Sequence, residues 1–286
     1  MMRLTLFRKT LRDNRGALIG GSLANVLIAL ADTLIYPSFR ESLAGYQFPE
    51  ALSGLLGEAT VDAYSSFEGF LTVEYFSFLP VLLIILAIVG GTAALVGEEE
   101  SGTLDLMLAQ PVSRHWIVFR KVTALAMVLV VTAFASLPAF LVALTRVDVV
   151  VNRWHLILAV INTFPIALFF LALSLFASAT MPTRGAAVLI AAGFAIVTYF
   201  FNLIGAAASQ VQFLQKLSPF YWADASHVLY HGFDWQRTAG FLLLTGALLV
   251  LTLVSFQRRD IAVSAREWHA RALLARLGSA LRVTAR

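Results

Sequence analysis

Six long runs of apolar residues dominate the pattern of hydrophobic and polar positions along this chain. The runs cover residues 17–36, 76–96, 117–144, 156–179, 186–208 and 239–256. Each run is close to the roughly 20 apolar residues that an α-helix needs to cross the hydrocarbon core of a bilayer. The pattern therefore predicts an all-α polytopic membrane protein with six transmembrane helices.

The composition excludes the other broad classes of protein. Of the 286 residues, 59% are hydrophobic and only 13% are charged, and the mean hydropathy is +0.81. A disordered chain needs low hydrophobicity and high charge, and a soluble domain needs more polar surface than this chain can supply. The chain has no cysteine, so it can form neither a disulfide nor a thiolate metal site.

The net charge of +4 fits either nucleic-acid binding or cytoplasmic loops rich in lysine and arginine, and the placement of the charges separates the two. An even number of spans puts both termini on one side, with the loops after the second and fourth spans. Most basic residues lie on that side, and the other side holds only Arg40, Arg146, Arg153, Lys216 and Arg237. The positive-inside rule therefore predicts a multi-pass protein of the cell (inner) membrane, with both termini cytoplasmic and no nucleic-acid partner.

The first span has features of a cleaved signal peptide, namely a basic start, an apolar run and the small-residue pattern Ala29-Leu30-Ala31. However, the apolar residues continue to Tyr36. Cleavage would also leave five spans and place the basic C-terminal tail outside. We therefore expect the first span to be retained.

Amphipathic segments flank and connect the spans of what we interpret as a single transmembrane domain, residues 1–286. Residues 1–16 place Arg8, Lys9 and Arg12 largely away from an apolar face, which predicts a helix on the membrane surface. Residues 17–256 form the six-span bundle. Residues 257–286 form a basic cytoplasmic tail that lies on anionic lipid, docks a partner or is disordered. The external segment 37–75 has a pattern typical of a short amphipathic helix on the outer surface, around Leu52 to Ala59. The aromatic residues of the other long external segment, 209–237, favour short interfacial or re-entrant helices over a solvated loop.

The loop after the second span is the most informative segment. Its three consecutive glutamates follow a helix C-terminus, where the helix dipole disfavours anions, and they lie on the side where basic residues dominate. A basic partner surface would account for them. Ser101 or Thr103 can cap a short helix whose apolar stripe is Leu104, Met107 and Leu108, and Pro111 ends it. Such a helix either transmits the movement of a soluble partner to the transmembrane helices or is a helical linker that only seals the end of the bundle.

The run GEEESGTLDLMLAQPVSR resembles the loop of type-2 ABC exporter permeases, in which an E-x-G-T-L pattern followed by a proline and an arginine comes after the second span. The resemblance covers essentially the whole chain, because the N-terminal amphipathic helix, the six spans and the short external helices before the last span agree with that family. The loop is the specific motif, and the remainder is architectural agreement. The large external domains of some relatives are missing.

The resemblance implies a permease subunit that dimerises with a second copy of itself and binds two copies of a separate ATPase subunit, which would hold ATP and Mg. It implies that residues 98–113 contain a coupling helix, that the N-terminal helix is an elbow helix, and that the first, second and fifth spans line the dimer interface and substrate path. The implied coupling residues are Glu98, Glu99, Glu100, Gly102, Thr103, Leu104, Leu108 and Arg114, and the elbow residues are Arg8, Lys9 and Arg12.

The sequence contains no motif for bond chemistry, which indicates that the chain is not an enzyme. It has no G-x-x-x-x-G-K-[ST] phosphate loop, no H-E-x-x-H zinc motif and no G-x-S-x-G elbow. We therefore expect no cofactor bound directly. Two alternatives remain: a secondary transporter or channel that works alone, and an intramembrane enzyme. Both would need more ionisable residues inside the spans than Asp32 supplies.

Three polar residues within the spans are candidates for the substrate path, namely Asn25, Asp32 and Asn202. The alternatives are that Asp32 reaches the outer headgroups and that the amides join packed helices. The set Asp224, His227 and His231 has spacing that could hold zinc, although surface polar residues on an interfacial helix explain it as well. Pro138 and Pro165 are expected to kink their helices.

Overall fold

The computed structural model describes residues 2–43, 64, 66–109, 112–149, 151–207, 209–223, 228–229 and 233–259. The described part is all-helical, and six of its helices are long and apolar enough to cross a membrane. These candidate spans are Arg15–Ser42, Phe67–Glu100, Arg114–Ala143, Arg153–Thr180, Arg184–Ala207 and Trp235–Arg258. The predicted all-helical fold with six long apolar helices is confirmed, and the first of these helices runs without a break through Ala29.

Three of the six candidate spans are single helices, and three are divided by short interruptions. The first and fifth spans are α2 (Arg15–Leu43) and α13 (Arg184–Ala207), and the last is α17 (Trp235–Arg258). The second span is divided into α5 (Phe67–Val73), α6 (Tyr75–Thr92), the π-helix η1 (Ala93–Gly97) and α7 (Glu98–Glu100). The third consists of α9 (Arg114–Phe134) and α10 (Ser136–Ala143), and the fourth of α11 (Arg153–Asn162) and α12 (Phe164–Thr180).

The third and fourth spans are interrupted next to the prolines that predict kinks. The break at Ala135 comes three residues before Pro138, and the break at Thr163 comes two residues before Pro165. Proline lacks an amide hydrogen, and its ring collides with the preceding turn of a helix, so the backbone bends on its N-terminal side.

Short helices complete the chain at both ends of the bundle. The N-terminal helix α1 (Met2–Asp13) lies along α9, and Asn14 alone separates it from α2. A six-residue helix, α8 (Thr103–Leu108), follows the glutamates. Before the last span, η2 (Ser209–Val211), α14 (Gln212–Leu217) and α15 (Pro219–Trp222) form the short helices that the sequence predicts there.

Two boundaries differ from the sequence prediction. The first span continues to Leu43 and the second begins at Phe67, so both ends of the segment predicted as an external loop, 37–75, are helical. Aromatic contacts among Tyr36, Phe67 and Phe70 hold these extensions together, which a count of apolar residues does not detect. The amphipathic helix predicted around Leu52 to Ala59 and the tail from residue 260 lie outside the described residues.

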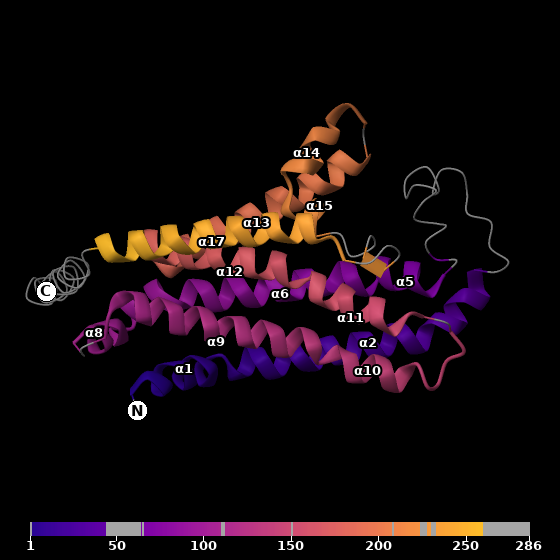
Figure 1. Cartoon of the computed structure of the whole chain (residues 1–286), viewed down its shortest axis with the longest axis horizontal. Coiled ribbons are helices and arrows are strands. Elements are labelled where there is room, and N and C mark those ends of the chain that lie inside the picture. Colours follow the sequence, from indigo (N-terminus) through magenta and orange to yellow (C-terminus); the bar gives the residue numbers. More distant parts are fainter. Residues whose placement is uncertain are drawn as a thin grey trace, which may run out of the picture.

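The second and fourth spans form the centre of the bundle. The most apolar window of each is 67% buried, whereas the corresponding windows of α2, α13 and α17 are 17–22% buried. Figure 1 shows α12 running beside α6, with α17 and α13 on one side and α9, α2 and α1 on the other. The outer helices expose large apolar side chains such as Leu189 and Leu243, as expected for surfaces that face lipid or another membrane subunit.

Small residues let the two central spans approach closely. A Cβ atom built on Gly91 of α6 would lie 2.6 Å from the Cβ of Ser174 on α12, a distance that side chains do not tolerate. Contacts of this kind are common where membrane helices pack, because small residues allow the backbones to approach. The second span is therefore fixed against α12 just before it reaches the glutamates.

Candidate functional site

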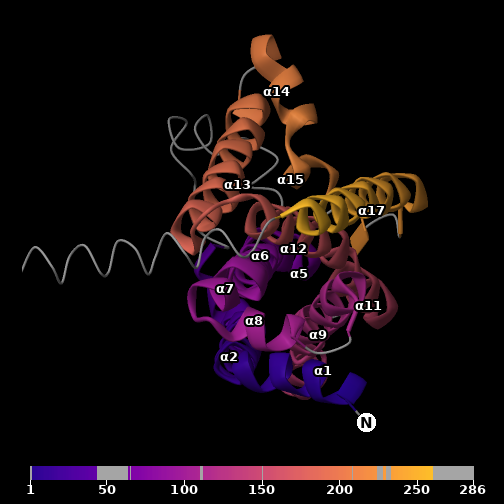
Figure 2. The same ribbon diagram turned by 90° about the vertical axis from the view of Figure 1, so that its left-hand side faces the viewer.

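The predicted coupling segment lies at one end of the bundle, which we call the α8 end. Figure 1 shows α1, α8 and the last turn of α17 at this same end, and Figure 2 looks onto it. The three glutamates of α7 lie among these elements, and each of them contacts a different part of the chain. We refer to Glu98, Glu99 and Glu100 as the glutamate cluster.

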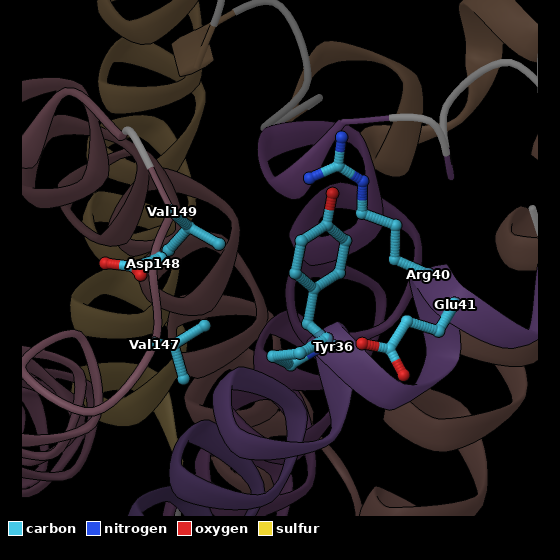
Figure 3. Close-up of a pocket in the computed structure, with 7 residues that line it drawn as sticks. Tyr36, Arg40, Glu41, Val147, Asp148 and Val149 are labelled. Carbon is cyan, nitrogen blue, oxygen red and sulfur yellow. The ribbon is translucent and has the colours of Figure 1, made fainter.

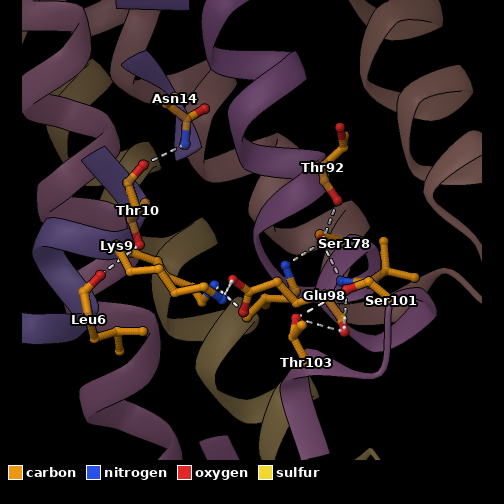
Figure 4. A network of polar contacts seen from close by, with 12 residues as sticks. Leu6, Lys9, Thr10, Asn14, Thr92, Glu98, Ser101, Thr103 and Ser178 are labelled. Atoms are coloured by element: carbon orange, nitrogen blue, oxygen red, sulfur yellow. Dashed lines mark hydrogen bonds and ion pairs between the residues drawn. The ribbon is translucent and has the colours of Figure 1, made fainter. Parts of the chain in front are cut away.

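Glu98 joins the N-terminal helix to the third span. Its Oε1 is 3.0 Å from Nζ of Lys9 on α1, and its Oε2 is 2.5 Å from Nζ of Lys121 on α9. The Lys121 side chain is only 1% exposed and that of Glu98 is 15% exposed, so both charges are largely removed from water. Figure 4 shows Lys9 reaching across from α1 to Glu98. A buried lysine of this kind requires a nearby carboxylate.

Glu99 and Glu100 bind the ends of two further spans. Glu99 Oε2 lies 2.9 Å from a guanidinium nitrogen of Arg259, directly after α17, and Arg259 also donates to the carbonyl oxygen of Ser178. Glu100 Oε1 accepts a hydrogen bond of 2.9 Å from the backbone amide of Arg184, the first residue of α13. A carboxylate at a helix N-terminus satisfies a free amide and interacts favourably with the helix dipole.

Two residues of the glutamate cluster, Glu98 and Glu99, thus form ion pairs within the chain. The sequence explains the three acidic residues by a basic partner surface, but Glu98 and Glu99 already pair with Lys9, Lys121 and Arg259. These partners are far away in the sequence, so inspection of the loop alone does not reveal them. Lys121 is the one that sequence reasoning could have found, because a lysine at the start of an apolar span needs a counter-ion.

The turn from α7 to α8 depends on a glycine. Gly102 has a φ of +70°, and its amide donates to the Glu99 carbonyl oxygen at 3.0 Å. The hydroxyls of Ser101 and Thr103 donate to the Glu98 carbonyl oxygen. After this turn, Leu104 is fully buried against apolar residues of the second, third and last spans, and Met107 packs beside it. The predicted apolar stripe therefore faces the bundle at these two positions, and the side chain of Leu108 is outside the described part.

Replacing Gly102 by alanine is expected to lower the free energy of unfolding by roughly 1 to 2 kcal/mol, because a side chain disfavours a left-handed backbone by about that amount. No atom lies within 4 Å of a Cβ built there, so the backbone conformation is the only cause. Thermal unfolding of the detergent-solubilised protein measures the change. Gly240→Ala is the control, since Gly240 is an exposed glycine of α17 with equal space and no positive φ. An equal loss in both variants would contradict this account.

Arg114, the arginine of the loop motif, binds the last span. Its Nη1 donates to the carbonyl oxygens of Phe256, Gln257 and Arg259 at 2.8, 3.1 and 2.9 Å, and its guanidinium lies over the Phe256 ring. In the predicted elbow helix, Lys9 pairs with Glu98, whereas Arg8 and Arg12 are exposed. The α8 end thus combines an internal set of charges with exposed cations on α1.

The three candidate substrate-path residues differ in their surroundings. The Asn25 amide is fully buried, donates to the carbonyl oxygens of Thr132 and Ala133, and accepts from the Tyr75 hydroxyl at 2.9 Å. These contacts favour helix packing, the alternative that the sequence left open. Asp32 and Asn202 each keep one buried side-chain oxygen without a hydrogen-bond partner in the described part of the chain.

The opposite end of the bundle carries a small open pocket of about 280 Å³. Figure 3 shows its lining, which includes Tyr36, Arg40 and Glu41 of α2 and Asp148 of the segment after the third span. Among the residues that the structure describes, no group of three acidic or histidine side chains is placed to hold a metal ion. The candidate set Asp224, His227 and His231 lies outside the described residues.

Comparison with known proteins agrees with this architecture. Residues 7–261 match the model of a protein family described as ABC-2 family transporter protein, whereas no curated protein matches the chain. The match spans all six candidate transmembrane helices, the glutamate cluster and α8, so it covers most of the chain. The chain is therefore a multi-pass membrane protein that belongs to the ABC-2 family of transporter permeases.

Proposed function

We propose that this chain is the permease subunit of an ATP-driven exporter, in which two copies form the substrate path and two separate ATPase subunits bind at the α8 end. Family membership implies association with ABC ATPase subunits. The observation that carries the coupling role is the glutamate cluster of α7, directly before α8, which contacts α1, α9, the start of α13 and Arg259 after α17.

These contacts support the proposal that α8 is a coupling helix. In this proposal, a displacement of α8 is transmitted to the second span through the Gly102 turn. It is transmitted to the third and last spans through the packing of Leu104 and through the ion pairs of Glu98 and Glu99. The pairs of Glu98 with Lys121 and of Glu99 with Arg259 are largely buried, so they are screened less than surface pairs, and we expect the elements that they join to move together. The exposed face of the segment includes Ser101, Gly102 and Ala109, which leaves a surface for the ATPase.

The outer faces of the bundle support the proposed dimer. The first and fifth spans, α2 and α13, expose apolar side chains along much of their length and are among the least buried spans. Both helices carry a candidate substrate-path residue with an unpaired buried oxygen, Asp32 on α2 and Asn202 on α13. In this proposal a second copy covers part of these faces, lipid covers the rest, and both termini lie in the cytoplasm.

A substitution at Ala109 tests the coupling role. Changes in the glutamate cluster would break internal ion pairs, so they cannot distinguish folding from partner binding. Ala109 is exposed just after α8, and Ala109→Arg is expected to reduce the co-purifying ATPase at least tenfold without changing the yield of permease. The measurement is quantitative mass spectrometry of tagged permease purified from native membranes. It gives the amount of any co-purified phosphate-loop ATPase per amount of permease.

The matched control places the same arginine at the opposite end of the bundle. Ser42 is exposed near the end of α2, and Ser42→Arg is expected to retain the full amount of ATPase. Recovery of no ATPase with the unmodified chain, combined with full transport by the purified permease alone, would favour the secondary transporter or channel instead. Equal loss of ATPase in both variants would contradict binding at α8.

A further inference from the structure

The second span changes its helical winding just before the glutamate cluster. Residues Ala93–Gly97 form the π-helix η1, between α6 and α7. A π-turn carries one more residue than an α-turn, so it advances everything after it by one residue relative to a continuous α-helix. One residue corresponds to about 100° of rotation and 1.5 Å of rise in an α-helix. The winding of η1 therefore determines which way Glu98, Glu99 and Glu100 point.

A single hydroxyl group from the fourth span satisfies the backbone of this π-turn. Ser178 Oγ, on α12, accepts hydrogen bonds from the amides of Leu95 and Val96 at 3.2 and 3.0 Å. The same oxygen donates to the carbonyl oxygen of Thr92 at 3.0 Å. Figure 4 shows Ser178 between Thr92 and the segment that leads to Glu98. One donor and two acceptor sites are all that a serine hydroxyl offers, so its capacity is fully used.

We propose that Ser178 is a positioning residue, which holds η1 in the π conformation and thereby sets the rotation of the glutamate cluster at the α8 end. Only the consequence of this positioning for ATPase coupling rests on the proposed function. The contact itself concerns how the second span is wound, so it can be tested on the permease alone.

Ser178 is expected to determine the winding of η1, because buried backbone amides and carbonyl oxygens without a hydrogen-bond partner are costly. Ser178 and Thr92 are fully buried, as is Val96, so no water replaces a lost hydroxyl. Without it, two amides and one carbonyl would lose a partner in a site with no water, and a continuous α-helix would become the better arrangement because it pairs amides internally. That change would turn Glu98 by about 100° and remove it from Lys9 and Lys121.

The same helix offers a matched control, Ser174. It lies one turn earlier on α12, is fully buried and also faces the second span, at Gly91. Its hydroxyl, however, donates to the Phe170 carbonyl oxygen of its own helix. Ser178→Ala and Ser174→Ala therefore remove the same atom from the same kind of site, but only the first removes contacts to η1.

The first experiment uses a cysteine as a reporter, which is possible because the natural chain has none. Leu104 lies after η1 and is fully buried, so Leu104→Cys is expected to react slowly with a membrane-permeant maleimide. Adding Ser178→Ala is expected to raise the labelling rate at least tenfold, and adding Ser174→Ala to leave it unchanged. Equal rates in the two backgrounds would overturn the proposal, whether or not any ATPase binds the chain.

The second experiment removes the extra residue of the π-turn. Deleting one of the adjacent alanines Ala93 and Ala94 makes a continuous α-helix place Glu98 where the π-turn placed it. The deletion is therefore expected to return the Ser178→Ala protein to the slow labelling rate of the Leu104→Cys parent, and to restore its expression if that was lost. A purely structural serine predicts the reverse, because a deletion inside a span adds a second defect. A double variant no better than Ser178→Ala would refute the inference.

Discussion

Replacing Glu98 by glutamine is expected to lower the free energy of unfolding by about 3 to 5 kcal/mol, because it leaves the buried Lys121 ammonium without a full counter-charge. Lys121 is 1% exposed and its nearest acidic contact is Glu98 Oε2. Glutamine keeps the size of the side chain and can still accept one hydrogen bond, so the loss measures charge rather than volume. Thermal or denaturant unfolding of the solubilised protein, followed by tryptophan fluorescence, gives the change.

Two further variants separate the ion pair from general damage. Glu41 is an exposed glutamate on the first span, at the end opposite α8, and Glu41→Gln is expected to change stability by less than about 0.5 kcal/mol. Lys121→Met combined with Glu98→Gln is expected to recover most of the loss, since an apolar replacement of a buried pair is often neutral. A double variant as unstable as Glu98→Gln would show that the charge of Lys121 is not the cause.

The architecture of this chain follows from local pattern. Each span is a run of apolar residues long enough to cross the bilayer, and in such a run only a helix satisfies the backbone, so composition and length suffice to find all six. Pro138 and Pro165 mark two interruptions for an equally local reason. The motif after the second span likewise located the glutamate cluster. The structure places this cluster against Lys9 of the N-terminal helix and Arg259 after the last span.

Apart from the need of Lys121 for a counter-ion, the contacts at the α8 end could not be predicted, because they depend on which helices are neighbours. Glu98 contacts Lys9, 89 residues away, and the Arg114 side chain bonds to the Phe256 carbonyl oxygen, 142 residues away. Ser178 resembles any serine of a membrane helix until η1 is placed beside it. A π-turn has no simple sequence pattern, since it arises where tertiary contacts satisfy the backbone groups that it frees. The sequence thus identified the acidic residues, but it did not reveal that Glu98 and Glu99 have partners within the chain.

Arg114 closes the end of the last span in a way that resembles a helix cap. Its Nη1 donates to three carbonyl oxygens at and just beyond the C-terminus of α17, where the last carbonyl oxygens of a helix have no partner within the helix itself. A cation at this place also interacts favourably with the negative end of the helix dipole. The first residue of the third span therefore holds the last span, while Arg259 beside it binds Glu99.

Replacing Arg114 by alanine is expected to lower the free energy of unfolding by about 1.5 to 3 kcal/mol, the range for hydrogen bonds to a charged group. Arg153→Ala is the control, because Arg153 likewise begins a span helix but is exposed. A cysteine at Thr252, a buried position of α17 one turn from Phe256, reports the release of this end. Maleimide is expected to label Thr252→Cys faster with Arg114→Ala than with Arg153→Ala. Equal labelling would contradict this account, because α17 would then keep its place through its packing on α12 alone.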